Sequence, residues 1–380
     1  MTDNCDKNET KCNEEILGQG SAKEQVLPIG KLDSSLLEDL VFKHLKYRRS
    51  DVKARPGIGL DCATLDFGEY DCVVSSDPIS AATNDIGRLA VHINCNDIAT
   101  QGVAPMAMTL VLLLPEGTTT KQLEDIMKQA GSEAAAIGVE IVGGHTEITD
   151  AVNKPVAVAT CFGKTSSRRE NFEMKPGDKV LMSKLAGLEG TAIVCSDAGD
   201  RLNFLTSEEI RHGKSLMNQL SVIKEGVISG EIGACGMHDV TEGGILGAVW
   251  EICQVANLGV KLYEDKISVD PVTVKLAQNL DFDYLRLISS GSMIIVAEAS
   301  RASEIIKRCE VVGVSVSEIG EVTSASEGCK ILVEAHKDEA KDCKSDGKVA
   351  GVWQKIDPPD ADHLYKAFEN LSKLIKESFD

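Results

Sequence analysis

One carboxylate in this sequence falls where a helix would bury it. Residues 86–100 have the apolar spacing of a helix, and each residue turns the chain by about 100°, so Ile86 and Leu89 share a face with Asp97. A carboxylate inside an apolar stripe is costly unless it is paired or binds a cation. The alternative is that the helix ends near Asn96 and that Asp97 caps a following turn.

Two more aspartates lie at the edges of predicted strands. Asp61 comes after a glycine turn, and Asp77 comes after the strand-like segment 72–76. Ligands collect at strand ends in α/β sheets. If these acids converge with Asp97, they would suit Mg²⁺, which takes oxygen ligands and bridges the phosphates of ATP. Taken singly, each is more often an ordinary turn aspartate.

Two polar segments rich in glycine could bind an anion. Gly143–Glu147 follows a predicted strand, and paired glycines let the backbone N–H groups approach a phosphate. The alternative there is a plain tight turn. The segment 237–244 precedes a predicted helix and could present Asp239 and Thr241 at its N-terminus, where the dipole favours anions. The alternative is ordinary N-capping by Thr241.

The bulk composition excludes several classes of protein. A chain of 380 residues predicts two domains, and no run of 18 apolar residues exists, so we expect no membrane span. The net charge of -19 disfavours nucleic acid as a partner. The 12 cysteines form no CxxC pair, which argues against zinc, and His145 and His238 lack a metal-ligand spacing. Because the N-terminus is polar, we expect a cytoplasmic protein with reduced thiols.

Alternating strand-like and helix-like stretches predict two α/β lobes. We expect a disordered extension over 1–28, a first domain over 30–165, a second over 175–335, and a polar tail with a short helix over 336–380. Helices are predicted over 32–45, 86–100, 121–138 (with Gly138 as its C-cap), 187–197, 213–226, 243–257 and 361–377. Strands are predicted over 72–76, 108–114, 139–144, 155–163, 179–183, 260–263, 292–299 and 313–322.

An ordered set of motifs resembles a known superfamily. The motifs are PGIGLDCA (56–63), SSDPI (75–79), NDIGRLAVHINCNDIATQGVAP (84–105), EIVGGHTE (140–147), MHDVTEGG (237–244) and LISSGSMIIVA (287–297). They are similar, in this order, to those of the PurM-like superfamily, which includes aminoimidazole ribonucleotide (AIR) synthetase, selenophosphate synthetase, thiamine-monophosphate kinase and HypE. The resemblance covers roughly residues 30–335 and is strongest to HypE and the HypE-like AIR synthase-related proteins.

The resemblance implies a fold, ligands and roles for particular residues. It implies a two-lobed PurM-like α/β (α+β) fold whose N-terminal sheets join in a homodimer, with ATP and Mg²⁺ between the lobes. It makes Asp61, Asp77, Asp97 and Asp239 the magnesium ligands. It makes Asn96, Gly143, Gly144, His145 and Thr146 the residues lining the phosphates. His145 and Glu242 are then the candidate catalytic groups.

The sequence also departs from the HypE pattern. The usual Asp-Asp pair of the first motif is Asp61-Cys62, and a Gly-Asp-His-Gly segment of HypE is replaced over 187–190. The last residue is Asp380 and the last cysteine is Cys343, so we find no terminal cysteine like that of HypE. These changes predict that the ATP site is kept and that the acceptor chemistry differs.

Three functions fit these observations. The first is an ATP-dependent, HypE-like enzyme that activates a carbamoyl or amide oxygen of a small molecule or a carrier protein. The second is a small-molecule kinase resembling thiamine-monophosphate kinase. The third is a nucleotide-binding maturation scaffold without catalysis.

Overall fold

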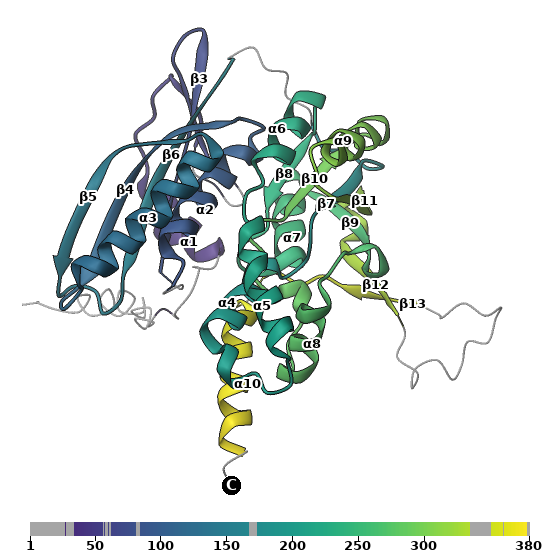
Figure 1. The fold of residues 1–380 in the computed structure, drawn as a ribbon. Coiled ribbons are helices and arrows are strands. Elements are labelled where there is room, and N and C mark those ends of the chain that lie inside the picture. The colour runs from purple at the N-terminus through teal and green to yellow at the C-terminus, as the bar shows by residue number, and fades with distance from the viewer. Residues whose placement is uncertain are drawn as a thin grey trace, which may run out of the picture.

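The computed structural model describes residues 27, 34–55, 57, 60, 62–80, 84–166, 173–334, 351–359 and 361–377. Asp61 and, apart from Leu27, the whole predicted N-terminal extension lie outside the described residues. The chain forms two lobes that lie side by side, each built around one sheet (Figure 1).

The first lobe is a six-stranded sheet in the order β1-β2-β3-β6-β4-β5, with helices α2 and α3 on one face (Figure 1). Strands β4 and β5 are parallel because α3 crosses between them, whereas the other neighbours are antiparallel. Its elements are α1 (Ser34–Leu40), β1 (Val52–Ala54), β2 (Ala63–Asp66), β3 (Tyr70–Ile79), α2 (Ile86–Thr100), β4 (Pro105–Pro115), α3 (Thr120–Ile137), β5 (Glu140–Thr149) and β6 (Val156–Ser166).

The second lobe is a seven-stranded sheet in the order β13-β12-β9-β11-β7-β10-β8. Its strands are β7 (Lys179–Ser183), β8 (Gly236–Asp239), β9 (Leu258–Tyr263), β10 (Met293–Ala297), β11 (Val316–Ser324), β12 (Cys329–Glu334) and β13 (Gly351–Lys355). Its helices are α4 (Leu188–Ala198), α5 (Ser207–Ser215), α6 (Ile223–Ile232), α7 (Gly244–Ala256), α8 (Pro271–Leu280), α9 (Ala299–Val311) and α10 (His363–Glu377). The mixed α/β class and the two lobes confirm the predicted fold class.

Local chemistry sets the ends of the predicted helix α3. The side chain of Thr119 accepts a hydrogen bond from the backbone N–H of Gln122, and the side-chain oxygen of Gln122 accepts one from the backbone N–H of Thr119. At the other end Gly138 takes the left-handed conformation, with φ 74°. The prediction of Gly138 as the C-cap is therefore confirmed.

Helix α2 is buried around its whole circumference, not along one stripe. Fourteen of its fifteen residues are buried, because the first sheet, α3 and the second lobe all pack against it. A Cβ on Gly226 of α6 would lie 2.5 Å from the backbone oxygen of Ala99, so the two helices meet at close range. The alternative in which the helix ends near Asn96 is wrong, since α2 continues to Thr100.

Three other sequence predictions need correction. The helix expected over 213–226 is broken: α5 ends at Ser215, a 3₁₀ turn covers 216–219, and α6 begins at Ile223. The strand expected to stop at Gly144 continues to Thr149, so the tight turn proposed there is wrong. The polar tail instead contributes β13 to the second sheet and docks α10 on the core through Leu364 and its apolar neighbours.

Candidate functional site

Asp97 sits at the centre of a buried polar cluster at the inner end of α2. Its side chain is 3% exposed, and its Oδ2 accepts a hydrogen bond of 2.5 Å from Ser75 Oγ on β3. Its backbone oxygen accepts from Thr100 Oγ1 at 2.6 Å and from the Cys62 thiol at 3.2 Å. The Cys62 thiol therefore contacts α2. Asp61, the residue before Cys62 in the sequence, is outside the described residues.

Asp77 lies two residues further along β3 from Ser75, and α2 holds its backbone. Asn94 Oδ1 accepts from the N–H of Asp77 at 2.8 Å, and Asn94 Nδ2 donates to its carbonyl at 3.3 Å. The carboxylate of Asp77 lies on the exposed part of the strand. Sequence reasoning missed Asn94; its signal was a second amide on α2, three residues before Asp97.

Asp239 ends strand β8 in the second lobe and is 1% exposed. Its backbone oxygen accepts from His238 Nδ1 at 2.7 Å, and His238 Nε2 lies 3.1 Å from Glu251 Oε2 on α7. His238 is therefore engaged on both ring nitrogens within the second lobe.

The helix α2 contacts both β3 and β8, so one helix brings the two lobes' aspartates into the same region. Among the described residues, no three His, Cys, Asp or Glu side chains gather closely enough to hold a metal ion by themselves. That is compatible with Mg²⁺, which commonly uses one or two carboxylates and completes its shell with water and phosphate oxygens. The oxygen chemistry of Asp77, Asp97 and Asp239 fits this ion.

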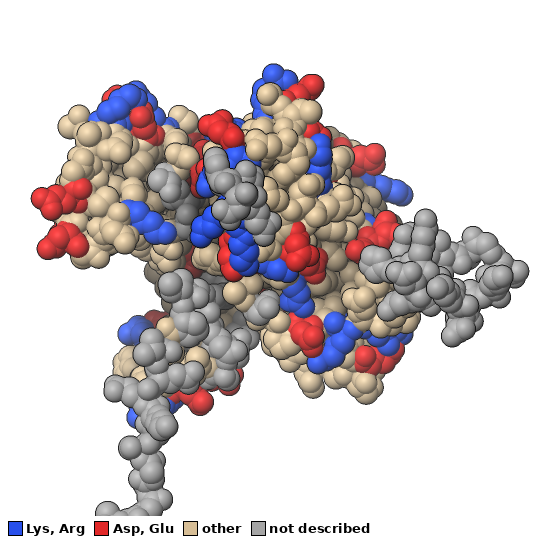
Figure 2. Space-filling view, turned by 90° about the horizontal axis from the view of Figure 1, so that it is seen from below, with Lys and Arg blue, Asp and Glu red and all other residues tan. Residues whose placement is uncertain are grey.

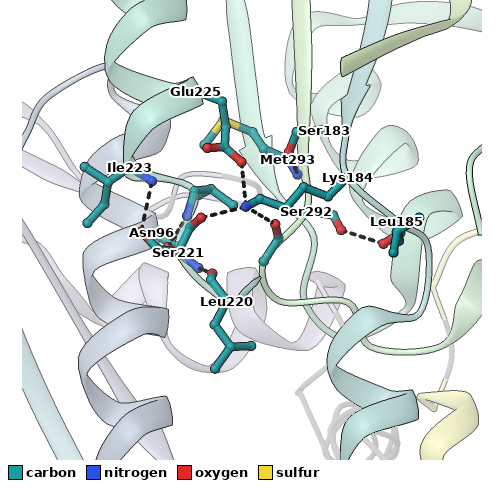
Figure 3. Close-up of polar contacts among 12 residues, drawn as sticks. Asn96, Ser183, Lys184, Leu185, Leu220, Ser221, Ile223, Glu225, Ser292 and Met293 are labelled. Carbon is teal, nitrogen blue, oxygen red and sulfur yellow. Dashed lines mark hydrogen bonds and ion pairs between the residues drawn. The ribbon is translucent and has the colours of Figure 1, made fainter. Parts of the chain in front are cut away.

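Asn96 is fully engaged in holding the two lobes together (Figure 3). Its Nδ2 donates to the backbone oxygen of Leu220 at 2.9 Å, and its Oδ1 accepts from the N–H of Val222 at 2.9 Å. Asn96 is 0% exposed. The structure therefore places this predicted phosphate-lining residue in an interlobe contact, and its amide explains why the helix predicted over 213–226 is interrupted.

A buried ion pair within the second lobe lies next to this interlobe contact (Figure 3). Lys184 Nζ lies 2.8 Å from Glu225 Oε1 and donates to the backbone oxygens of Ser221 at 2.6 Å and Gly291 at 2.7 Å. Lys184 has φ 56°, a conformation that costs a residue with a Cβ about 1–2 kcal/mol. Sequence reasoning missed this pair, because nothing in the local pattern distinguishes Lys184 from a surface lysine.

The segment Gly143–Thr146 lies far from Asp77 within one chain. Register pairs place Asp77, Ala159, Leu110 and Gly144 in one row across the first sheet. Three strand spacings of about 4.8 Å separate the ends of this row by roughly 14 Å. Strand β5 is the sheet edge farthest from the second lobe (Figure 1). A Cβ on Gly144 would lie 1.8 Å from the oxygen of Leu110, so that glycine is required by the close approach of β4.

The loop after Asp239 is surrounded by carboxylates. Glu242 is exposed on this loop, while Glu189 and Asp362 are buried. Burial, together with the charges of Glu242 and Asp362, raises the pKa of Glu189 to about 7. Burial also raises the pKa of Asp362 to about 6, although backbone N–H groups of Leu364 and Gly243 favour its charged form.

Acidic and basic side chains are interspersed on the face shown in Figure 2, and the net charge is -19. Within the described part of the chain, no helix has both the length and the apolar character that a bilayer crossing requires.

Comparison with known proteins identifies similar chains. The N-terminal domain model of "AIR synthase related protein" matches residues 59–165, and the C-terminal domain model matches residues 175–330. A Methanocaldococcus jannaschii protein, provisionally named for hydrogenase expression/formation, is 29% identical over 76% of this chain and 89% of its own length. Carbamoyl dehydratase HypE of Rhodobacter capsulatus is 29% identical over 66% of this chain and 71% of its own. Thiamine-monophosphate kinase of Pyrococcus horikoshii is 26% identical over 62% and 78%.

Solved structures of HypE are also similar to this chain. The HypE–HypF complex contains a chain with a TM-score of 0.68 and 23% identity, which covers 86% of this chain and 100% of that one. HypE in complex with ATP gives a TM-score of 0.64 at 22% identity, with coverage of 89% and 97%. These structures share the two-lobed fold.

Proposed function

Because this chain belongs to the AIR synthase-related, PurM-like family and lies close to HypE within it, we propose that it is an ATP-dependent enzyme that transfers a phosphoryl group to a carbamoyl or amide oxygen. The observation that carries the proposal is that β3 of the first lobe and β8 of the second both pack against α2, the helix on which Asp97 is buried. Similarity to HypE, one of whose structures holds ATP, supports the choice of nucleotide.

In the proposed reaction, the acceptor oxygen forms a bond to the γ-phosphorus as the bond to the β,γ-bridging oxygen breaks, and ADP leaves. Mg²⁺ would neutralise charge on the phosphates when bound, with Asp61, Asp77, Asp97 and Asp239 as its ligands. The hydrogen bond from Ser75 orients the carboxylate of Asp97. Because Asp97 is excluded from water, its charge acts at a low local dielectric.

We further propose that the enzyme works as a homodimer joined along the first sheet. Strand β5 is an edge strand of ten residues, and Val142 and Ile148 on it are more than half exposed. A long edge strand with unpaired backbone groups and exposed apolar side chains is a liability unless another chain covers it. In such a dimer Gly143, Gly144, His145 and Thr146 would serve a phosphate site that one chain does not complete, with His145 or Glu242 as proton-transfer groups.

Asp97→Asn tests the proposal most directly, with Asp178→Asn as its matched control. Both aspartates are buried, but Asp178 directly precedes β7, two strands away from β8, and lies at the other end of the strands from Asp239. We expect Mg-ATP turnover or binding to fall by about 100-fold or more in Asp97→Asn alone, since loss of even an outer-shell partner costs 10–100-fold. Equal activity in both variants would overturn the role of Asp97.

A kinase is the second candidate, because thiamine-monophosphate kinase of Pyrococcus horikoshii is also a relative. The two chemistries differ in where the phosphoryl group ends. A kinase leaves it on a stable organic product, whereas activation of an amide oxygen releases it as inorganic phosphate with loss of that oxygen. Mass spectrometry of products made with [¹⁸O]-labelled acceptor separates them, and ATP binding without any turnover across acceptors would favour a scaffold.

A further inference from the structure

One carboxylate bridges the N-termini of two helices in the second lobe. Asp362 Oδ2 accepts from the N–H of Gly243 at 2.8 Å, at the start of α7. Asp362 Oδ1 accepts from the N–H of Leu364 at 2.7 Å, in the first turn of α10. The side chain is buried, so these bonds are shielded from water. A segment 119 residues further along the chain thus supplies the cap of α7.

Helix α7 has no side-chain cap of its own. The residue at its N-cap position is Gly243, with φ 83°, so the alternative in which Thr241 caps this helix is wrong. Gly244 also has a positive φ of 61°, and a Cβ there would lie 2.5 Å from the oxygen of Leu285. Two consecutive glycines lose much backbone conformational entropy when the loop is ordered. Contacts from outside the loop must therefore stabilise it.

The bridged loop leads directly to Asp239. Residues 240–243 join the end of β8 to the start of α7, and the ion pair of His238 with Glu251 holds the strand to that same helix. Asp362 supplies a second anchor, at the loop's other end. Pro359 adds a third contact, since its Cβ is 2.9 Å from the position that a Cβ on Gly243 would take.

The segment that carries Asp362 is itself well anchored. The N–H of Ile356 donates to the oxygen of Cys329 at 2.9 Å, and Ile356 is buried in the second core. After Asp362, the apolar face of α10 packs into the core with Leu364, Ala367 and Leu371. Asp362 therefore accepts the hydrogen bond from the α7 loop at a position that is fixed by packing on both sides of it.

We propose that Asp362 is a positioning residue that holds the loop from Asp239 to Gly244 in the conformation used by the proposed Mg-ATP site. This inference rests on the proposed function. It assigns the C-terminal segment 351–377 to the second-lobe wall of the site.

Asp362→Ser separates positioning from capping. Serine is among the best N-cap residues, so it keeps the cap on α10, but its single, shorter oxygen cannot also reach Gly243. Asp270→Ser is the matched control, because Asp270 is a similarly buried N-cap that accepts from Val272 N at 2.8 Å at the start of α8. Hydrogen exchange of the full chain and calorimetric binding of Mg-ATP are measured on both variants and the wild type.

We expect Asp362→Ser to speed amide exchange over 243–246 by about 10-fold and to weaken Mg-ATP binding by about 10-fold, as for outer-shell partners of metal sites. Asp270→Ser should change neither. Unchanged exchange in Asp362→Ser would overturn the bridge, and faster exchange with wild-type affinity would overturn the positioning role. A wild type that binds no Mg-ATP would overturn the proposed function, whereas binding that is equal in all three proteins would overturn this inference alone.

Discussion

The inner end of α2 and the edge strand β5 both carry polar motifs, yet the structure treats them in opposite ways. At the end of α2, Asn96 and Asp97 are buried and hydrogen-bonded within one chain. On β5, Gly143 to Glu147 are exposed along a free sheet edge. One chain therefore forms all the contacts described for the first region, and the second is the edge at which we propose that another chain or a ligand binds.

The largest expected effect is on the buried pair beside α2. Lys184→Met leaves the carboxylate of Glu225 buried without its cation, and we expect the free energy of unfolding to fall by about 3–5 kcal/mol. Urea denaturation measures this loss. The double variant Lys184→Met/Glu225→Gln should recover part of it, and a single variant as stable as wild type would show that the fold of the second lobe does not depend on this pair.

Asn96→Ala tests the amide that joins the lobes. It leaves the oxygen of Leu220 and the N–H of Val222 without their partner, which should cost about 2–4 kcal/mol at roughly 1–2 kcal/mol for each of the two buried groups. Denaturation should therefore begin at lower urea. We expect the adjacent Asp97 to lose its placement as well, so Mg-ATP affinity measured by calorimetry should fall. Wild-type stability would show that α2 is held by packing alone.

Glu189 contrasts with Glu225, because its Oε2 accepts a 3.3 Å hydrogen bond from Ser290 N, whereas Glu225 is paired with Lys184. Its folded pKa of about 7 lies above the ordinary 4.5, so its contribution to stability is full below pH 4.5 and is lost as pH rises through 7. Glu189→Gln should remove that loss and raise stability at pH 8 by up to about 3 kcal/mol. Identical pH profiles of unfolding in both proteins would contradict the raised pKa.

The smallest effect on folding is expected at the exposed edge. Ile148→Lys should change the free energy of unfolding by no more than about 0.5 kcal/mol, because the side chain is 53% exposed. It should nevertheless weaken the proposed homodimer, which sedimentation velocity measures. Val311→Lys, at an exposed site on the second lobe, is the control. A dimer that withstands Ile148→Lys would place the interface elsewhere.

The local sequence was enough for elements whose own residues define them. The capping pair of Thr119 and Gln122, with Gly138 at the other end, encloses α3 within two residues of the prediction. Helix α2 was predicted over its observed span because its apolar spacing is strong. The ordered motifs indicated the family, and the two matching domain models confirm it.

Only the tertiary structure decided the rest, because it depends on partners distant in the chain. The helix predicted over 213–226 is interrupted where Asn96, more than a hundred residues earlier, binds Leu220 and Val222. Lys184 becomes a buried cation only because Glu225 and two carbonyls surround it. The cap of α7 comes from Asp362. Local periodicity records which face of a segment is apolar, but it carries no information on which distant group will meet that face.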